Sequence, residues 1–285
     1  MKLGFSTWGM PQVPIDVALS HLATLGFDAV EVVVLPRFTT ALDQLDGPAR
    51  RRIGRLLADL PLQLSALNYY TSLLDPAPDR FDQLVTRLRE VMELAALWMD
   101  GDTPVVITGI GGQPGELPAR LPQLAERLAL LGEAAQELGA ILALEPHVGT
   151  AVETPDQMLA LLAQVGSPAV RVNFDISHFN VMGIPLEESV ARMLPHAVHT
   201  HVKDERGRVP DYEYVIPGEG EFDYVAYLRC MNAHGYRGVI SVEISNMVQR
   251  RPGYDPLEVA SRSYQVLARA FQQAGIARGT PSTGA

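Results

Sequence analysis

Short runs rich in Val, Ile and Leu recur along this chain, and longer mixed stretches separate them. Most positions within each run are apolar, whereas a strand with one solvent-exposed face would alternate apolar and polar residues. Continuous apolar runs of this length are typical of parallel strands buried on both faces. Eight strands are therefore predicted, over residues 2–7, 29–34, 62–68, 104–109, 141–146, 170–175, 197–202 and 238–245.

The stretches between the predicted strands place apolar residues three and four positions apart, which indicates amphipathic helices. The clearest helices are predicted over residues 14–26, 121–140, 154–166, 223–235 and 255–275. Thr154 is a predicted N-cap, and Gly26, Gly139 and Gly166 are predicted helix ends. Eight strands, each followed by a helical stretch, predict a (β/α)8 barrel.

The predicted fold class is thus α/β, with a single (β/α)8 TIM barrel over residues 1–276 and a flexible tail over residues 277–285. The competing architecture is an open, doubly wound sheet with a nucleotide-binding GxGxxG loop. The candidate loop is GIGGQPG, residues 109–115, where Pro114 occupies the position of the third glycine. We therefore interpret this stretch as a loop of the barrel.

Composition excludes several classes of partner. The chain has 23 Lys and Arg against 33 Asp and Glu, a net charge of −10, whereas nucleic-acid surfaces need clustered basic residues. No run approaches the roughly 18 apolar residues of a membrane span, and the N-terminus lacks the apolar core of a signal peptide. With one cysteine, Cys230, no intrachain disulfide is possible. We expect a cytoplasmic protein that binds neither nucleic acid nor membrane.

Four consecutive predicted strands end on side chains that can bind a metal: Glu145, Asp175, His201 and Glu243. In a TIM barrel, the carboxyl ends of the strands form the mouth where chemistry takes place. Three carboxylates that converge without a cation would repel one another. Each residue taken singly has a structural salt bridge as its alternative, but four in succession favour a metal site. Oxygen donors with one imidazole favour one divalent ion, Mn²⁺ first, with Mg²⁺, Co²⁺ or Zn²⁺ as alternatives.

The segment HTHVKD, residues 199–204, places His199, His201 and Lys203 on one side of a strand. His199 lies one layer deeper than His201, and we interpret it as a support for that residue or as a core histidine, with metal ligation as the alternative. Lys203 lies just past the strand. It either reaches substrate oxygens or is an exposed residue paired with Asp204.

The segments ALEPH, NFDISH, HTHVKD, PGEGEFDY and SVEIS, in this order, resemble the xylose-isomerase-like barrel superfamily. More narrowly, they resemble the sugar phosphate isomerase/epimerase group, with its ketose 3-epimerases, hydroxypyruvate isomerase, inosose dehydratase and, more distantly, endonuclease IV. The resemblance covers nearly the whole chain. It implies that the four strand-end residues are metal ligands and that Glu145 and Glu243 also carry protons.

The resemblance also implies substrate-binding residues. His178 matches a histidine that contacts a substrate oxygen in the ketose epimerases, with a helix cap as the alternative. Glu31 ends the second strand, where a pocket acid is common in the group. His147 shares the parity of Glu145 and is expected to face the pocket. The epimerases usually carry another glutamate six residues after the first ligand, where this chain has Ala151.

Two further residues are placed at the expected pocket by their positions next to strands. Asn68 ends the third strand and is expected to hydrogen-bond a substrate hydroxyl. Trp8 follows the first strand, where it forms either a sugar-stacking wall or ordinary loop packing.

In this group, a metal polarises the carbonyl of a keto-sugar and a carboxylate removes the neighbouring proton, which leads to a metal-stabilised enediolate. The resemblance therefore implies a metal-dependent isomerase or epimerase that acts on a keto-sugar or related polyol. Ala151 and His147 favour the alternative, a dehydratase or lyase acting on an inosose or keto-glycoside. A small carbohydrate is the expected partner. Many members of the group are dimers or tetramers, so a homo-oligomer is an open alternative to a monomer.

Overall fold

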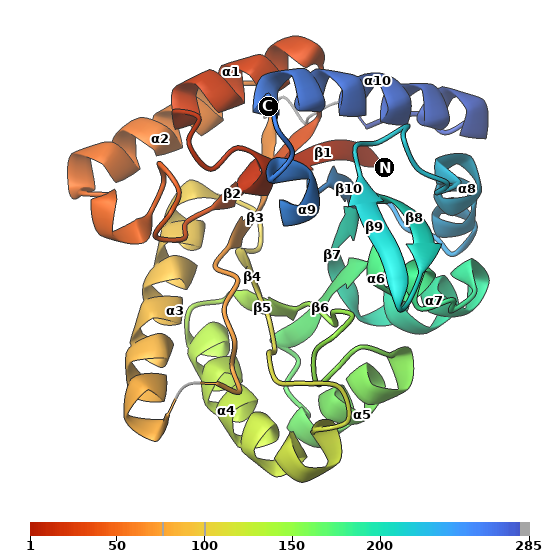
Figure 1. The fold of residues 1–285 in the computed structure, drawn as a ribbon. Helices are drawn as coiled ribbons and strands as arrows, with labels where there is room; N and C mark the ends of the chain where they lie inside the picture. Colours follow the sequence, from red (N-terminus) through yellow and green to blue (C-terminus); the bar gives the residue numbers. More distant parts are fainter. Residues whose placement is uncertain (76, 100, 280–285) are drawn as a thin grey trace.

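Eight parallel strands close into a barrel in the computed structural model, which describes residues 1–75, 77–99 and 101–279 (Figure 1). Around the barrel the strands follow the order β1-β10-β7-β6-β5-β4-β3-β2. Their bounds are β1 Lys2–Ser6, β2 Ala29–Val33, β3 Gln63–Asn68, β4 Val105–Thr108, β5 Ile141–Leu144, β6 Val170–Asp175, β7 Ala197–Val202 and β10 Val239–Val242. The predicted single (β/α)8 barrel is confirmed.

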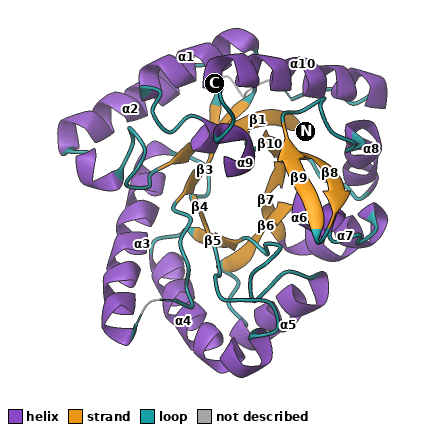
Figure 2. Ribbon diagram, in the orientation of Figure 1, coloured by secondary structure: helices purple, strands orange, loops and turns teal. Residues whose placement is uncertain are grey.

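Helices form a ring around the barrel (Figure 2). They are α1 Ile15–Leu25, α2 Gly47–Asp59, α3 Pro78–Trp98, α4 Leu117–Glu137, α5 Pro155–Val165, α6 Ile176–Val181, α7 Leu186–Met193, α8 Tyr224–Ala233 and α10 Pro256–Ala274. Single turns are η1 Thr7–Gly9, η2 Leu42–Gln44, η3 Leu194–His196 and the short α9 Asn246–Gln249, which lies over the mouth in Figure 1.

Local sequence signals set most of the helix ends. The predicted N-cap Thr154 forms a reciprocal capping box with Gln157, and Gly26 and Gly166 end their helices in the left-handed conformation. Helix α4 begins four residues earlier than predicted, because Pro118 occupies its first turn. The helix then continues through Pro122.

A hairpin that the sequence analysis missed follows β7. Strands β8 (Asp204–Arg208) and β9 (Asp211–Val215) pair antiparallel to each other, outside the barrel sheet. In Figure 1 the hairpin lies beside the mouth at the carboxyl end of β7. It brings Tyr214 of β9 to the candidate site.

Side chains that alternate along the barrel strands belong to two separate apolar clusters, one outside the barrel and one in its lumen. Residues such as Leu67, Val106 and Leu142 belong to the main core, where the strands pack against the helices. The neighbouring positions form a separate small cluster in the lumen, made of Ala66, Val105, Ile107 and Ala143. Because side chains alternate faces, Glu145 shares the lumen parity of Ala143. The lumen is therefore apolar at these positions and carries polar residues toward the mouth.

The predicted tail begins with ordered contacts. The backbone N–H of Gly279 donates to the carbonyl of Met1 at 2.8 Å, and Arg278 lies 3.6 Å from the Asp28 carboxylate. Residues 280–285 of the predicted tail lie outside the described residues. Among the described helices, none combines the length and apolar character that crossing a bilayer requires.

Candidate metal centre and active site

The ends of β5, β6, β7 and β10 bring together the four side chains predicted as metal ligands. Strand β6 pairs with β7 so that Asp175 lies opposite His201, and His201 lies opposite Ser241 of β10. One donor atom from each ligand, Glu145, Asp175, His201 and Glu243, lies within 4.8 Å of the others, and all four residues are buried. A metal ion could therefore contact all four.

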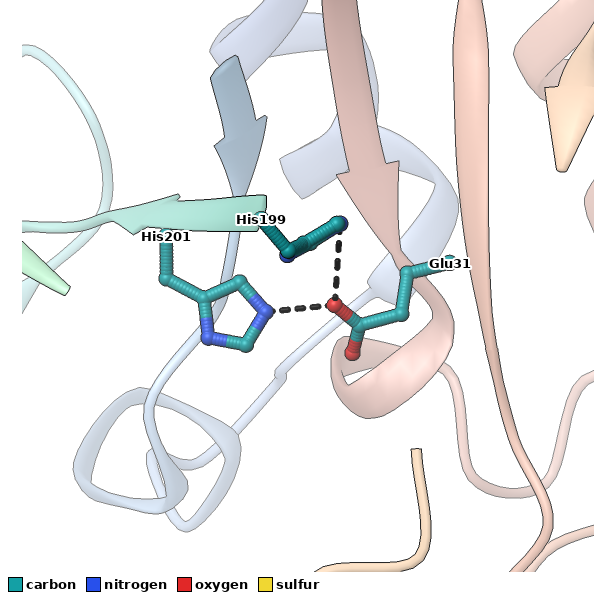
Figure 3. Close-up of side chains that lie close together, drawn as sticks. All are labelled: Glu31, His199 and His201. Carbon is teal, nitrogen blue, oxygen red and sulfur yellow. Dashed lines mark hydrogen bonds and ion pairs between the residues drawn. The ribbon is translucent and has the colours of Figure 1, made fainter. Parts of the chain in front are cut away.

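The His201 ring is held in one orientation by Glu31 of β2 (Figure 3). Its Nε2 lies 2.5 Å from Oε2 of Glu31, while its Nδ1 lies 2.8 Å from Oε2 of Glu243. Ser6 and Asn68 donate to the other oxygen of Glu31, at 2.6 and 2.9 Å. A carboxylate behind a histidine orients its ring, so Nδ1, which faces Glu243 and Asn173, is the nitrogen that could bind a metal. Glu31 was expected to bind substrate, and the structure places its carboxylate against the His201 ring and outside the cavity lining.

His199 lies one layer below His201, as expected from the strand parity. Its Nδ1 is 3.0 Å from Oδ1 of Asn173, and its Nε2 is 3.1 Å from the Ser65 hydroxyl and 3.7 Å from Glu31 (Figure 3). Asn173 in turn donates to Oε2 of Glu145 at 3.2 Å. His199 thus supports the ligand layer through Asn173.

Lys203 points into the site and is buried. Its Nζ contacts Oδ2 of Asp175 and lies 3.1 Å from Oε2 of Glu243. The alternative of an exposed lysine paired with Asp204 does not hold. The Asp204 carboxylate instead accepts backbone N–H groups of the following loop, from Gly218, Gly220 and Phe222.

Burial and neighbouring charges shift the pKa values of Glu31, Asp175 and Lys203 in opposite directions. Burial raises the pKa of Glu31, but the charge of His201 and its hydrogen bond bring that pKa down to about 2. Burial also raises the pKa of Asp175, and Lys203 holds it below its usual range. For Lys203 the signs reverse, because burial lowers its pKa and the carboxylates of Asp175 and Glu243 raise it well above the usual value. The site therefore contains ionised carboxylates and a charged lysine at neutral pH.

His178 links the ligands to the hairpin. Its Nε2 lies 3.1 Å from Oε1 of Glu145 and 3.3 Å from Oδ2 of Asp175, and its Nδ1 lies 2.7 Å from the Tyr214 hydroxyl. The helix-cap alternative does not describe His178, since Asp175 caps α6 by accepting from Ser177. His178 is buried and orients two carboxylates.

A cavity of about 230 Å³ opens above the ligands. It is lined by Trp8, Asn68, Tyr70, Glu145, His147, Lys203, Tyr214, Glu243, Ser245 and Asn246. Of the four ligands, Glu145 and Glu243 reach this lining, whereas Asp175 and His201 lie beneath it. The two glutamates are thus the ligands placed to touch a bound molecule.

Four of the expected substrate-binding residues line the cavity: Trp8, Asn68, His147 and Lys203. Trp8 packs against Phe38 and Tyr70, with ring centroids 5.8 and 6.0 Å apart, so it serves both as a wall and as loop packing. Asn68 contributes a buried Oδ1 that has no hydrogen-bond partner in the described part of the chain. His147 stacks on His178 with the ring centroids 3.7 Å apart.

The His147 ring presents an acceptor to the cavity. Its Nδ1 lies 2.6 Å from the carbonyl oxygen of Val148, so this nitrogen carries the proton and Nε2 has the lone pair. Burial, together with the charge of His178, lowers the pKa of His147 to about 3. A neutral imidazole with a free Nε2 can accept a hydrogen bond from a hydroxyl.

Ala151 is fully buried beneath the loop that follows β4. Its N–H donates to the carbonyl of Gly111 at 3.0 Å. Gly112 has a φ of +74°, and a Cβ there would lie 2.9 Å from the Ala151 methyl. The glycine turn therefore occupies the space above position 151, and this position contributes no polar group to the cavity.

The sequence analysis missed five residues of the site: Tyr70, Asn173, Tyr214, Ser245 and Asn246. Asn173 has the parity of Asp175 in VRVNFD, so period-two counting could have found it. The alternation in DYEYV could have indicated the hairpin that carries Tyr214. Tyr70 and Ser245 lie just past strands and Asn246 begins the short helix α9, where no periodic signal marks them.

The charge balance of the site fits a divalent cation. Once a metal replaces the extra proton of His201 the imidazoles are neutral, so Glu31, Glu145, Asp175 and Glu243 carry four negative charges, and Lys203 supplies one positive charge. A divalent ion would reduce the remaining three negative charges to one, which lowers the cost of burying them. Carboxylate oxygens with one imidazole suit Mn²⁺, Mg²⁺, Co²⁺ or Zn²⁺. The cluster could therefore bind a metal, and its donor set does not identify the ion.

Relatives with curated descriptions include an epimerase and a dehydratase. Fructoselysine 3-epimerase of Escherichia coli O157:H7 is 27% identical over 88% of this chain and 93% of that protein. Inosose dehydratase of Salmonella typhimurium strain LT2 is 27% identical over 49% of this chain and 50% of that protein. The chain spans about half of the length of several such relatives, including 50% of the rhizopine catabolism protein MocC of Rhizobium meliloti.

Solved structures share the architecture. The crystal structure of the IOLI protein with a binding zinc atom superposes with a TM-score of 0.76 over 96% of this chain and 98% of that chain, at 20% identity. At this identity the likeness shows the fold alone. The sequence model of the xylose isomerase-like TIM barrel matches residues 19–270, and the chain therefore belongs to the xylose isomerase-like TIM barrel family.

Proposed function

We propose that this protein is a divalent-metal-dependent isomerase or epimerase that removes a proton next to the carbonyl of a keto-sugar or related polyol. The observation that carries the proposal is the buried Glu145, Asp175, His201 and Glu243 cluster at the floor of a cavity, where the two glutamates reach the cavity. The full-length relationship to fructoselysine 3-epimerase supports it. The proposed setting is the cytoplasm, with a small carbohydrate as partner.

The four ligands would hold one divalent ion, through His201 Nδ1 and an oxygen from each carboxylate. When bound, such an ion acts as a Lewis acid that polarises a carbonyl and acidifies the adjacent C–H. Mn²⁺ is our first choice, and the zinc named with the IOLI protein supports Zn²⁺ as an alternative.

Glu145 and Glu243 are the proposed proton carriers. They follow β5 and β10, which lie on different sides of β6 and β7 in the barrel, and both reach the cavity. One carboxylate can remove a proton from one face of the substrate while the other returns a proton to the opposite face, which gives an epimer. Return of the proton to the neighbouring carbon gives an isomer.

Other residues of the lining would orient the substrate. The free Nε2 of His147 accepts a hydrogen bond from a hydroxyl, and the unpartnered Oδ1 of Asn68 accepts another. Trp8 offers an apolar ring to the C–H face of a sugar. His178 positions Glu145 and Asp175 from below and does not line the cavity, so in this proposal it acts on the substrate through them.

The second candidate function is dehydration of an inosose or keto-glycoside. The Lys203 ammonium lines the cavity, where it can donate a hydrogen bond to a departing hydroxyl, while the carboxylate that removed the C–H proton returns it to that hydroxyl so that water leaves. Position 151 contributes no carboxylate to compete with this step. The inosose dehydratases among the relatives support this candidate.

Deuterium exchange tests both candidates. The purified protein with Mg²⁺ would be incubated in D₂O with separate ketoses, hydroxypyruvate, inososes and 3-keto-glycosides, and followed by NMR. Deuterium next to a carbonyl would identify the substrate class, and the product would separate epimer, aldose and dehydrated ketone. Glu145→Gln and Glu243→Gln variants should each lose exchange by a factor of at least about 100. Absence of exchange across the panel with bound metal would contradict the proposal.

A further inference from the structure

We infer that Glu187, Cys230 and His234 form a second metal site, on the outer helical layer, for a borderline divalent ion of the Zn²⁺ class. One donor atom from each residue lies within 4.8 Å of the other two. None of the three lines the cavity at the barrel mouth. This inference is independent of the proposed function.

Two neighbouring helices supply the donors. Cys230 lies in α8 and His234 is its C-cap, so the two are one turn apart and face the same side. Glu187 lies in the first turn of α7. One Glu187 oxygen is 3.1 Å from Cys230 Sγ, and its other oxygen is 3.3 Å from His234 Nε2. The carboxylate therefore lies between the thiol and the imidazole.

The His234 ring is already oriented as a metal-binding histidine. Its Nδ1 lies 3.1 Å from the backbone carbonyl of Cys230, where it donates its proton. Histidine ligands of metals commonly donate their second nitrogen to a carbonyl or carboxylate, which fixes the tautomer. The Nε2 lone pair then faces an oxygen of Glu187. Two acceptors at this distance repel each other unless a proton or a metal cation lies between them.

The separations suit a tetrahedral ion. Ligands about 2.0–2.3 Å from Zn²⁺ lie about 3.3–3.8 Å apart in a tetrahedron. The contacts of 3.1 and 3.3 Å, one to each oxygen of Glu187, lie close to this range, and one donor atom from each residue lies within 4.8 Å of the others, so side-chain rotations would open the site. Thiolate, imidazole and carboxylate form a mixed donor set that Zn²⁺ and Co²⁺ accept and that Mg²⁺ and Ca²⁺ do not favour.

The site is accessible from solvent. The Glu187 side chain is 74% exposed and that of His234 is 29% exposed, which leaves an entry path and room for a water as fourth ligand. The Cys230 thiol donates its proton to an oxygen of Glu187. A bound ion would replace that proton and join α7 to α8.

Cobalt spectroscopy tests this site separately from the barrel mouth. The chain has one cysteine, and the mouth ligands contain no sulfur, so any near-ultraviolet thiolate-to-Co²⁺ band must come from Cys230. The reduced full-length protein would be titrated with Co²⁺. We expect the intensity of this band to saturate when one Co²⁺ is bound at the Cys230 site, and excess Zn²⁺ should abolish it. No band at saturating Co²⁺ would overturn the inference.

Matched variants separate a three-ligand site from a thiol that binds cobalt alone. Cys230→Ser should abolish the band, and Glu187→Gln or His234→Gln should weaken binding about tenfold or more. A band unaffected by both Gln variants would overturn the inference. Asp175→Asn, which removes a mouth ligand, should lower the total bound Co²⁺ while the band remains. Loss of the mouth site thereby leaves this test intact.

Discussion

Glu31 Oε2 lies 2.5 Å from Nε2 of His201, on the side of the ring opposite the nitrogen that faces Glu243. The contact spans the lumen from β2 to β7 and involves two fully buried side chains. The pairing of β2 with β3 shifts register between Val30 and Glu31, directly beside this residue. Irregularities of this kind re-aim side chains near functional sites. Glu31 therefore holds the Nε2 side of the His201 ring, and the Nδ1 side faces the cluster that could bind a metal.

The Glu31 carboxylate should set metal affinity without touching the metal. Glu31→Gln keeps the volume but removes the charge that orients His201. Metal affinity should fall about 10–100-fold while the fold is retained, as measured by calorimetric titration with Mn²⁺. Ser6→Ala is the matched control, because Ser6 donates to the other oxygen of Glu31. Equal affinities in wild type and Glu31→Gln would refute this role.

Removal of a ligand should empty the mouth site and spare the barrel. His201→Ala and Asp175→Asn each delete one of the four donors but leave the β6–β7 pairing to the backbone. Metal content after dialysis should drop to background, and far-ultraviolet circular dichroism should match wild type. Full metal occupancy in either variant would show that the four-ligand assignment is wrong.

The Lys203 ammonium should matter most for stability when no metal is bound. Lys203→Met leaves Asp175 and Glu243 without their buried counter-charge. The free energy of unfolding with EDTA should fall by about 3–5 kcal/mol, and by less with saturating Mn²⁺, because the ion compensates the same carboxylates. Urea unfolding under both conditions measures the difference.

Arg206→Met is the matched control for Lys203→Met. Arg206 lies three residues further on and forms an exposed ion pair with Glu213. Its replacement should change stability by less than about 1 kcal/mol with or without metal. A Lys203→Met loss that is the same in EDTA and in Mn²⁺ would contradict a shared role of the lysine and the ion.

Glu205 should make the protein less stable as the pH rises. Burial raises the pKa of Glu205 to about 8, and one of its oxygens has no hydrogen-bond partner among the described residues. Between about pH 4.5 and 8 the unfolded chain has lost this proton while the folded protein keeps it. The folded state then binds more protons, so stability falls with rising pH and levels off above 8.

The Glu205 effect is measured by urea unfolding at pH 5 and pH 8.5. Glu205→Gln should reduce the fall in stability between these values, by an amount on the order of a few kcal/mol. Glu213→Gln, on the exposed side of the same hairpin, should leave the fall unchanged. An identical pH dependence in wild type and Glu205→Gln would rule out this residue as the cause.

The pattern of apolar runs was enough to predict the barrel, because parallel strands buried on both faces need nearly continuous apolar sequences. In a barrel, residues at the carboxyl ends of the strands meet at the mouth. This was enough to predict that Glu145, Asp175, His201 and Glu243 lie together, because the end of each strand can be recognised in the local sequence. Asn173 followed the same rule but was overlooked.

Contacts across the lumen depended on the tertiary structure. Glu31 and His201 lie 170 residues apart, and no local pattern indicates that one carboxylate supports the other. Tyr214 reaches His178 because an unpredicted hairpin folds beside the mouth. Lys203 turns inward because two carboxylates attract it more strongly than solvent does, and Asp204 is engaged by backbone N–H groups.

The cluster of Glu187, Cys230 and His234 also depends partly on local sequence and partly on tertiary packing. The spacing of Cys230 and His234 places both on one side of α8, which sequence alone can determine from helix geometry. Glu187 joins them only because α7 packs beside α8. The sequence by itself thus determined the periodic elements and the residues at their ends, because periodicity is local. The packing of distant elements decided which of these residues became partners, because the charge and burial of each depend on neighbours far away along the chain.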